Sequence, residues 1–184
     1  MIDEDDALAW ERLDYEVAYS CPGFEIVHET VRMPDGTETD FDYLSEPESV
    51  VILPFTTTGD VVVIEEWREA VKRVNYGLPA GSIEPDDANF ATAARRELEE
   101  ETGYVAGAVD LLVSVEPANG IADTHHHYFV ATDCEPAGEQ QLDFNESIRV
   151  GTTQYDDLLE RALAGGVPDG RTLLGLLYYD AHRR

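Results

Sequence analysis

Four glutamates crowded within five residues constrain the fold of this chain more than any other feature. They are Glu97, Glu99, Glu100 and Glu101. Glu97 and Glu101 stand at i and i+4, where like charges that face each other on a helix cost about a few tenths of a kcal/mol. The same pair becomes useful when it holds a divalent cation, because hard cations bind several converging carboxylate oxygens. A solvated acidic face is the other interpretation of this run.

The residues before the glutamates predict a helix that lines the rim of a cleft. Phe90, Ala94 and Leu98 recur at i, i+4 and i+8, a spacing that predicts one buried stripe. At roughly 100° per residue, Glu97 and Glu101 lie beside that stripe rather than opposite it. The pair is therefore expected at a partly buried edge and not on the open solvent face.

Turn and capping residues mark the ends of this helix. Residues 79–81, Pro-Ala-Gly, predict a tight turn, and residues 85–87, Pro-Asp-Asp, predict a further turn that includes the N-cap. Gly103 predicts a left-handed C-terminal cap. Arg96 adjoins Glu97 and is expected to hold a glutamate carboxylate in place.

The segment as a whole resembles the Nudix box, G-x5-E-x7-R-E-U-x-E-E-x-G-U, in which U is an apolar residue. Residues 96–104 match its second half position for position, apart from Tyr104 at the last apolar place. The first half differs, because the loop is one residue longer than the pattern. Its first glutamate is replaced by Asp86 or Asp87, or is lost to Ala88.

The whole chain is strongly acidic and almost without lysine. Its 184 residues include 39 Asp and Glu against 12 Lys and Arg, which gives a formal charge of −27, and Lys72 is the single lysine. Only residues 3–6 form an acidic block, so the charge is spread as in halophilic proteins, where molar salt screens charges within roughly 3 Å. An acidic partner-binding tail would instead concentrate the charge in one block.

Several classes of protein are excluded by this composition. An acidic field repels nucleic acid, so no nucleic-acid partner is expected. Cys21 and Cys134 lie far apart and in no C-x-x-C motif, which predicts reduced thiols. No apolar run approaches the ~20 residues that span a bilayer, and the acidic N-terminus lacks the cationic region of a signal peptide. We expect a soluble cytoplasmic protein with no membrane contact.

Residues 1–47 predict a small antiparallel β layer. Strand-like runs at residues 24–33 and 37–44 flank Pro-Asp-Gly at 34–36, a favourable hairpin turn, and residues 15–19 predict a further strand. A layer of about 40 residues is too small to be stable alone. We therefore expect it to pack on the main domain or on a second subunit, and we expect a homodimer.

The main domain is expected at residues 48–184. Strands are expected at residues 50–55, 61–66, 109–115, 127–132 and 147–150, and helices at 156–164 and 172–182, besides the glutamate helix. Strands before, between and after helices favour a mixed sheet between helical layers. The fold class is therefore α/β, and the resemblance implies a Nudix-type α/β/α sandwich with the added N-terminal antiparallel layer.

Two motifs outside the box resemble the subgroup of ADP-ribose and other nucleoside-diphosphate-sugar pyrophosphatases. They are Glu66-Trp67-Arg68 followed by Gly77-Leu78-Pro79-Ala80-Gly81, and the late Asn145-Glu146-Ser147-Ile148. The chain departs from the subgroup twice, because Glu66 stands where glutamine is usual and Gly77 stands where the subgroup has glutamate. More than one substrate of the subgroup therefore stays open.

The resemblance implies a metal-dependent site on the glutamate helix. Glu97 and Glu101 would be the main side-chain ligands of Mg²⁺ or Mn²⁺, and Glu100 would join them or orient water. The Ala80 carbonyl would be a further ligand, as in the subgroup. Arg96 would assist by holding the carboxylates.

Arg68 would grip the phosphate of the sugar half of the substrate, by the same resemblance. Guanidinium forks suit phosphate oxygens, because two parallel N–H groups meet two oxygens. The alternative is a surface ion pair with a neighbouring glutamate, either Glu65 or Glu69.

The general base is expected in the late loop. The subgroup places two acids there, two residues apart, and Glu146 matches the second of them. The first falls on Phe144, which accepts no proton. Either Asp143 substitutes for it, or Glu146 serves alone.

These features together predict a pyrophosphohydrolase of a nucleoside diphosphate sugar, with ADP-ribose as the first candidate. The implied products are AMP and ribose 5-phosphate, formed when a bound water attacks one phosphorus and a loop carboxylate takes its proton. Another Nudix substrate, such as a GDP-sugar, a dinucleotide cofactor or a nucleoside triphosphate, is the second hypothesis. A Nudix-fold module that senses nucleotide sugars without cleaving them is the third.

Overall fold

The chain is described by a computed structural model that covers residues 7–183, so the acidic block at residues 3–6 lies outside the described residues. The chain forms two compact units, each with most of its contacts within itself. The first comprises Met1–Pro47 and Glu116–His125, and the second comprises Glu48–Val115 and His126–Arg184.

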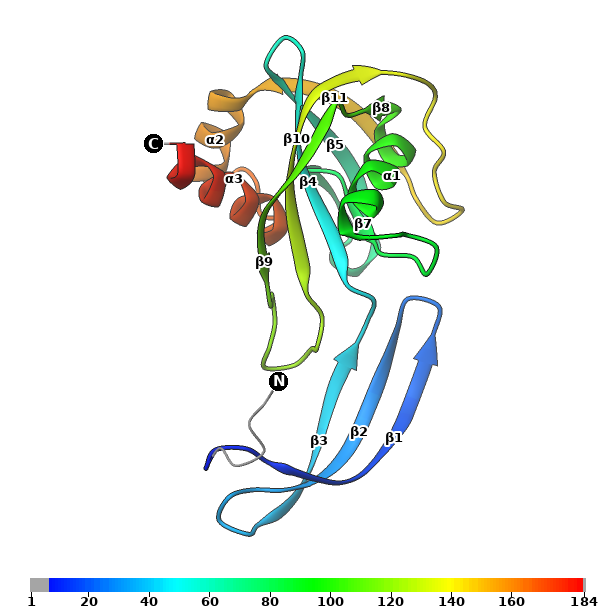
Figure 1. Cartoon of the computed structure of the whole chain (residues 1–184), viewed down its shortest axis with the longest axis vertical. Coiled ribbons are helices and arrows are strands. Elements are labelled where there is room, and N and C mark those ends of the chain that lie inside the picture. Colours follow the sequence, from blue (N-terminus) through cyan, green and yellow to red (C-terminus); the bar gives the residue numbers. More distant parts are fainter. Residues whose placement is uncertain (1–6, 184) are drawn as a thin grey trace. The chain divides into compact units, whose positions relative to one another are not determined.

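The first unit carries a three-stranded antiparallel sheet, drawn in blue and cyan in Figure 1. Its strands are β1 (Glu11–Cys21), β2 (Phe24–Arg32) and β3 (Glu38–Ser45), in the order β1-β2-β3. The predicted turn closes with the Gly36 N–H donating to the Met33 carbonyl at 2.9 Å, and Gly36 has a φ of 84°. Glycine adopts this positive φ without steric strain, which explains the residue at this turn.

One loop of the first unit was expected in the main domain. Residues 116–125 connect two strands of the second unit, yet they hydrogen-bond to β3. The Leu44 N–H donates to the Ile121 carbonyl at 2.8 Å, and the Asp123 N–H donates to the Leu44 carbonyl at 3.1 Å. These bonds join residues that are 77 or more positions apart along the chain. Local sequence patterns do not predict such pairing.

A mixed sheet of eight strands forms the second unit. Its strands are β4 (Ser49–Thr56), β5 (Asp60–Arg68), β6 (Arg73–Gly77), β7 (Ala80–Ser82), β8 (Tyr104–Val105), β9 (Ala108–Val115), β10 (His126–Pro136) and β11 (Ile148–Gln154). The main path runs β11-β5-β4-β10-β8, with β6 on β5, β7 on β4 and β9 on β10. Only β4 and β10 pair in parallel, so the sheet is mixed as predicted.

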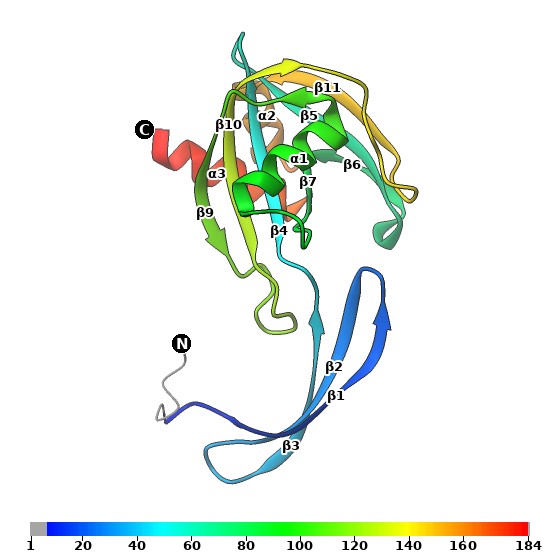
Figure 2. The same ribbon diagram turned by 45° about the vertical axis from the view of Figure 1, so that its right-hand side comes forward.

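Helices cover both faces of this sheet. They are α1 (Phe90–Thr102), α2 (Tyr155–Leu163) and α3 (Gly170–Arg183), besides a short 3-10 turn at Glu69–Val71. Figure 2 shows α1 in front of the sheet and the other two helices behind it. The predicted α/β/α sandwich is confirmed.

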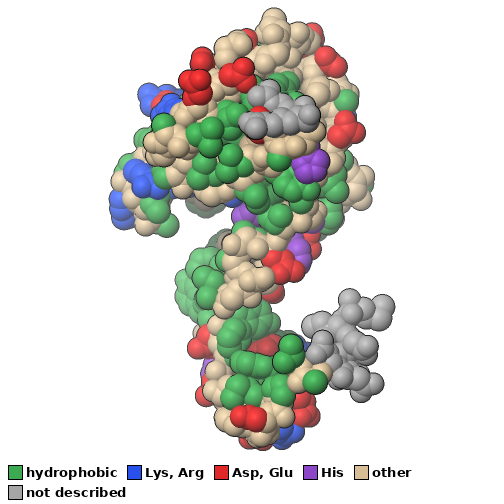
Figure 3. Space-filling view, turned by 90° about the vertical axis from the view of Figure 1, so that its left-hand side faces the viewer, with side chains coloured by type: hydrophobic (Ala, Val, Ile, Leu, Met, Phe, Trp, Pro, Cys, Tyr) green, Lys and Arg blue, Asp and Glu red, His purple; other side chains and the backbone are tan. Residues whose placement is uncertain are grey.

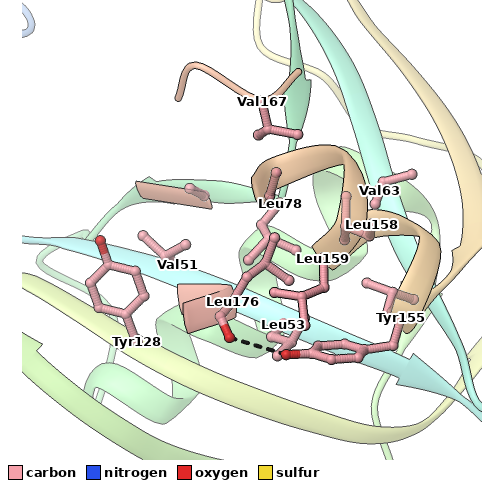
Figure 4. Close-up of a cluster of buried hydrophobic side chains, with 13 residues drawn as sticks. Val51, Leu53, Val63, Leu78, Tyr128, Tyr155, Leu158, Leu159, Val167 and Leu176 are labelled. Carbon is pink, nitrogen blue, oxygen red and sulfur yellow. Dashed lines mark hydrogen bonds between the residues drawn. The ribbon is translucent and has the colours of Figure 1, made fainter. Parts of the chain in front are cut away.

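Alternation along β4 divides the core between the two faces. Val50 and Ile52 pack with α1, whereas Val51 and Leu53 pack with α2 and α3 in the cluster of Figure 4. All four side chains are at most 1% exposed. A strand that is apolar at every position is expected where both faces of a sheet are covered.

The short strands β6, β7 and β8 were not predicted. They span five, three and two residues, which is too short for a hydrophobic period to be visible. β11 was predicted at residues 147–150 but extends to Gln154, because β5 offers it partners along that length. Pairing with a distant strand, rather than local pattern, sets these boundaries.

The N-cap of α1 differs from the prediction. Asn89 is the N-cap, and its side-chain oxygen accepts from the Thr92 N–H at 2.9 Å. Asp86 is exposed, and Asp87 bonds the Arg96 guanidinium instead of capping the helix. Gly103 forms the predicted left-handed C-cap, with a φ of 72°.

Replacement of Asn89 by Ala tests this cap. The free energy of unfolding should fall by about 1 kcal/mol, because one N–H of the first turn loses its acceptor. Asp86→Ala is the matched control and should change it by less than about 0.5 kcal/mol, since Asp86 is exposed. Chemical denaturation measures both values, and the reverse ranking would contradict the assignment of the cap.

Candidate active site

The two glutamates predicted to act together are buried side by side on α1. Glu97 is 8% exposed and Glu101 is 2% exposed, and both lie beside the fully buried Leu98. They are therefore deeper than the cleft rim predicted from helical spacing. The strand β7 packs against them, because a Cβ added at Gly81 would overlap the Glu97 carboxyl group. Only glycine permits this approach without a shift of neighbouring atoms.

Arg96 connects these carboxylates to the loop before the helix. Its Nη1 donates to Glu97 Oε1 at 2.8 Å and to Glu100 Oε2 at 2.9 Å. Its Nη2 donates to Asp87 Oδ2 at 2.8 Å and to the Ser82 carbonyl at 2.9 Å. The structure thus brings Arg96 and the predicted glutamates together, and it adds Asp87 as a partner that was considered only as a replacement for a lost glutamate.

Burial shifts the acidity of both inner glutamates. Desolvation raises the pKa of Glu97 to about 7, against the opposing effect of the Arg96 charge. Desolvation raises the pKa of Glu101 to about 9, although the Ala80 N–H donates to its Oε2 at 2.9 Å and so favours the ionised form. Charge is disfavoured in a low-dielectric site, so each buried carboxylate holds its proton more strongly.

The donor set fits a hard divalent cation. Carboxylate oxygens are the ligands that such ions prefer, and a bound cation would offset the desolvation of Glu97 and Glu101. Within residues 7–183, however, no group of three or more His, Cys, Asp or Glu side chains is arranged to hold a metal ion. Arg96 occupies oxygens of Glu97 and Glu100, and the Ala80 N–H occupies one of Glu101.

Arg68 lies at the end of β5, near the glutamates. Its Nη2 is 2.7 Å from Glu66 Oε2, and its side chain is 33% exposed. Glu65 and Glu69, the partners considered for it, pair with other cations. Burial and the charge of Arg171 lower the pKa of Arg68, whereas nearby carboxylates including Glu101 raise it.

The loop after β10 docks on the C-terminal end of α1. Gln140 Nε2 donates to the Glu101 carbonyl at 2.6 Å, and the Gln141 N–H donates to the Glu100 carbonyl at 2.8 Å. These bonds use carbonyls that the last turn of a helix leaves without partners. Neither glutamine was singled out from the sequence, because nothing local indicates which helix end a loop will meet.

This loop brings Glu146 close to the buried glutamates. The Glu146 charge raises the pKa values of Glu66, Glu97 and Glu101. The Asp143 N–H donates to Glu146 Oε2 at 3.0 Å, so the backbone of Asp143 orients that carboxylate. Phe144 between them is fully exposed.

The start of α3 supports the same site from the other face of the sheet. Thr172 Oγ1 donates to Asp169 Oδ2 at 2.7 Å and accepts from the Leu78 N–H at 3.0 Å. A Cβ added at Gly77 would overlap Thr172 Oγ1, which explains glycine at a position where the resemblance has glutamate. Sequence reasoning missed this contact, although Asp169 three residues before Thr172 is a recognisable N-cap signal.

Comparison with known proteins identifies the family. The model of the NUDIX domain matches residues 46–174 of the chain. The chain belongs to the Nudix family. It is therefore a Nudix pyrophosphohydrolase, as the glutamate segment predicted. No helix in the part of the chain that the structure describes is long and apolar enough to cross a membrane.

Several known proteins are similar to most of the chain. The "ADP-ribose pyrophosphatase" of Bacillus subtilis (strain 168) is 28% identical over 89% of this chain and 88% of its own length. The "Methanol dehydrogenase activator" of Bacillus methanolicus is 27% identical over 80% of each. The crystal structure titled "ADP compounds hydrolase" superposes with a TM-score of 0.81 at 19% identity, covering 94% of this chain and 92% of that one, and shows the shared fold.

Glu101→Gln in buffer without divalent cations tests the buried carboxylate. A folded-state pKa of about 9, above the ordinary 4.5, means that stability from this group is complete below about pH 4.5 and is lost as the pH rises toward 9. The amide carries no charge and still accepts from the Ala80 N–H. The variant should therefore melt at a higher temperature than wild type at pH 8, and the gain should vanish near pH 4.5.

Glu99→Gln is the matched control for this experiment. Glu99 is exposed on the same helix, two residues from Glu101. Its replacement should give no pH-dependent gain in melting temperature. An equal gain for both variants would show that the general negative charge of the chain, and not the burial of Glu101, causes the effect.

Proposed function

We propose that this Nudix enzyme hydrolyses the pyrophosphate of a nucleoside diphosphate sugar, with ADP-ribose as its first candidate substrate and AMP and ribose 5-phosphate as products. The observation that carries the proposal is the buried pair Glu97 and Glu101, held by Arg96 and the Ala80 N–H beside the loop carboxylate Glu146. Relatives from Bacillus subtilis and Mycobacterium tuberculosis that bear the name ADP-ribose pyrophosphatase support the choice of substrate.

The cofactor that we propose is Mg²⁺ or Mn²⁺. Glu97 and Glu101 would hold it, with Glu100 and the Ala80 carbonyl as further oxygen ligands. Such an ion would neutralise the charge of the diphosphate and polarise a water molecule. Arg96 keeps Glu97 and Glu100 oriented toward the same side of α1, because one guanidinium group bonds both.

Arg68 is proposed to bind a phosphate of the substrate. Its side chain is 33% exposed, and its guanidinium group contacts Glu66 through one nitrogen, so other N–H groups remain for phosphate oxygens. In a site with this many carboxylates, a dianionic substrate needs such a positive group as well as a cation.

Glu146 is proposed as the general base that takes the proton of the attacking water. Its charge is among the main causes that raise the pKa values of both inner glutamates. The Asp143 N–H holds the Glu146 carboxylate and so fixes the direction in which it accepts a proton. Asp143 is accordingly proposed as the residue that positions the base.

Glu146→Gln should lower kcat for ADP-ribose by about 10²–10⁴-fold with a nearly unchanged KM, because the amide accepts no proton. Release of AMP in molar KCl with Mg²⁺ measures the effect, since the composition suits high salt. Glu139→Gln, an exposed carboxylate of the same loop, is the control and should keep wild-type kcat.

Two other outcomes of this assay have defined meanings. If the wild-type protein binds ADP-ribose but cleaves no diphosphate in a panel of nucleotides, the proposal of an enzyme is wrong and the protein is a sensing module. If it prefers to cleave a GDP-sugar, a dinucleotide cofactor or a nucleoside triphosphate, the proposed substrate is wrong and the proposed hydrolysis of a pyrophosphate stands. The second outcome has a basis in the sequence, because Glu66 and Gly77, which depart from the subgroup, lie on the neighbouring strands β5 and β6.

We also propose that the enzyme is a homodimer. The sheet of the first unit exposes large apolar side chains, which Figure 3 shows in green at the surface of that unit. They include Tyr15 and Tyr19 of β1, which are 59% and 56% exposed, and Trp10 just before that strand is 49% exposed. Apolar surface of this kind is costly in water and marks a protein contact, and a second copy of the chain is the partner that we expect.

Light scattering in molar KCl should give twice the chain mass of 20.4 kDa. Tyr15→Arg should weaken the dimer, because it places a charge on the apolar face, and Glu16→Arg is the control on the opposite face of β1. A wild-type mass equal to one chain would contradict the proposal. Equal dissociation of both variants would point to a general effect of charge.

A further inference from the structure

One large apolar side chain in the loop between β10 and β11 is fully exposed. Phe144 is 100% exposed, at the centre of a turn that closes with the Glu146 N–H donating to the Asp143 carbonyl at 3.1 Å. Phenylalanine is among the residues that are most often buried, whereas turns favour glycine, proline, asparagine, aspartate and serine. The turn itself therefore gives no reason for a phenylalanine at this position.

A surface pocket of about 400 Å³ borders the same loop. Its apolar lining comes from Trp67 of β5, Val74 of β6, and Leu142 and Ile148 at the two ends of the loop segment that carries Phe144. Trp67 and Val74 are partners in the pairing of β5 with β6, and they are 45% and 50% exposed. Figure 2 shows the loop passing beside β6. An uncovered apolar surface thus lies between the residues that flank Phe144.

The size and the charges of this pocket suit a phenyl ring. A cavity of about 150 Å³ is enough to hold benzene, so the pocket has room for the Phe144 side chain. Two charged residues line it, Glu65 and Arg149, and they form an ion pair with each other at 2.9 Å. An apolar ring that enters the pocket therefore meets charges that are already paired.

The loop segment that carries Phe144 is short and is fixed at both ends. The Gln141 N–H donates to a carbonyl of the last turn of α1 at 2.8 Å, and the Trp67 N–H donates to the Ser147 carbonyl at 3.2 Å. Phe144 is two residues from Leu142, so their Cα atoms are at most about 7 Å apart. The ring can reach the pocket through a change within the turn, while both ends of the segment keep their bonds.

The position of Phe144 matters because it shares its turn with the proposed base. Glu146 is repelled by the inner carboxylates Glu97 and Glu101, and a cation held by that pair would turn the repulsion into attraction. Holding Glu146 in one place then costs the conformational entropy of the turn. Burial of a phenyl ring two residues away offsets this cost, because apolar surface leaves water.

We propose that Phe144 is a positioning residue: its ring enters the pocket of Trp67 and Val74 when cation and substrate bind, and so fixes the turn that carries Glu146. The proposal, called the Phe144 anchor below, rests on the proposed function. The resemblance places an acid at this position, so the anchor belongs to this chain and does not follow from the resemblance. The competing interpretation is that Phe144 contacts a second copy of the chain.

Fluorescence of Trp67 tests the entry of the ring into the pocket. The chain has two tryptophans, so Trp10→Phe leaves Trp67 as the single one. With Mg²⁺ and a methylene analogue of ADP-ribose that is not hydrolysed, the emission should shift to shorter wavelength. Quenching by acrylamide should fall by about half, because the ring covers an indole that is 45% exposed. Phe144→Ala in the same background should bind the analogue without either change.

Kinetics separate a positioning role from a structural one. Phe144→Ala should lower kcat for ADP-ribose by about ten- to a hundredfold at a nearly unchanged KM, because the base is displaced while the substrate-binding groups remain. Its melting temperature without ligand should equal that of wild type, since the side chain is exposed there. Phe144→Leu should restore most of kcat, because leucine also fills an apolar pocket.

Leu163→Ala is the matched control for the loss of an exposed apolar side chain. Leu163 is 69% exposed on α2 and is not among the residues that line the pocket. The variant should keep the wild-type kcat and the ligand-dependent change of Trp67 fluorescence.

A double-mutant cycle tests where the ring binds. Val74→Ala should also lower kcat, and the double variant with Phe144→Ala should be no slower than the slower single variant, because both changes remove the same contact. Effects of the two substitutions that multiply would place the ring elsewhere and overturn the proposal.

Other results would also overturn the Phe144 anchor. If Phe144→Ala keeps the wild-type kcat while Glu146→Gln loses it, the anchor is wrong and the proposed function stands. The anchor is equally wrong if Trp67 shows no ligand-dependent change, or if the change follows protein concentration, which would assign Phe144 to a contact between chains. If Trp67 responds to the analogue only when Phe144 is present but ADP-ribose is not hydrolysed, the anchor stands and the proposed substrate is wrong.

Discussion

The burial of two carboxylates on one face of α1 is the constraint on which the rest of the structure depends. Glu97 and Glu101 are almost fully removed from water, and a buried charge without compensation costs several kcal/mol. The fold compensates with the Arg96 guanidinium on one carboxylate and the Ala80 N–H on the other. Arg96 lies on α1 itself and Ala80 lies on β7, so this strand and the helix must be placed together.

Small residues and long-range hydrogen bonds then bring the other elements to this pair. Gly81 lets β7 approach the Glu97 carboxyl group. Gly77 leaves room for Thr172 of α3, whose hydroxyl accepts from the N–H of the next residue, Leu78. On the opposite side, the loop that carries Glu146 is tied to the last turn of α1 by Gln140. The site is thus assembled from three directions around one helix.

Local patterns predicted the parts of this protein that depend on neighbouring residues. The Gly103 cap and the long strands of the sheet follow from period and turn chemistry. Of the predicted stripe, Ala94 and Leu98 are buried, whereas Phe90 in the first turn of the helix is 40% exposed, so the prediction was wrong for Phe90. The predicted position of the N-cap was wrong, because Asp87 and Asn89 are both good capping residues. Arg96 bonds the Asp87 side chain, and Asn89 caps the helix. The partner of Arg68 was missed for a similar reason, since three glutamates near it are equivalent in sequence.

The sequence by itself determined the family, the α/β sandwich and the identity of the carboxylates on α1, because the Nudix box and the helical and strand periods are local. Only the tertiary structure decided the acidity of Glu97 and Glu101, the approach of Glu146, and the placement of Arg171 beside Arg68. Desolvation exists only when distant segments exclude water, and hydrogen bonds across the sheet join residues that are remote along the chain. For this reason the chemistry of the site is a property of the fold.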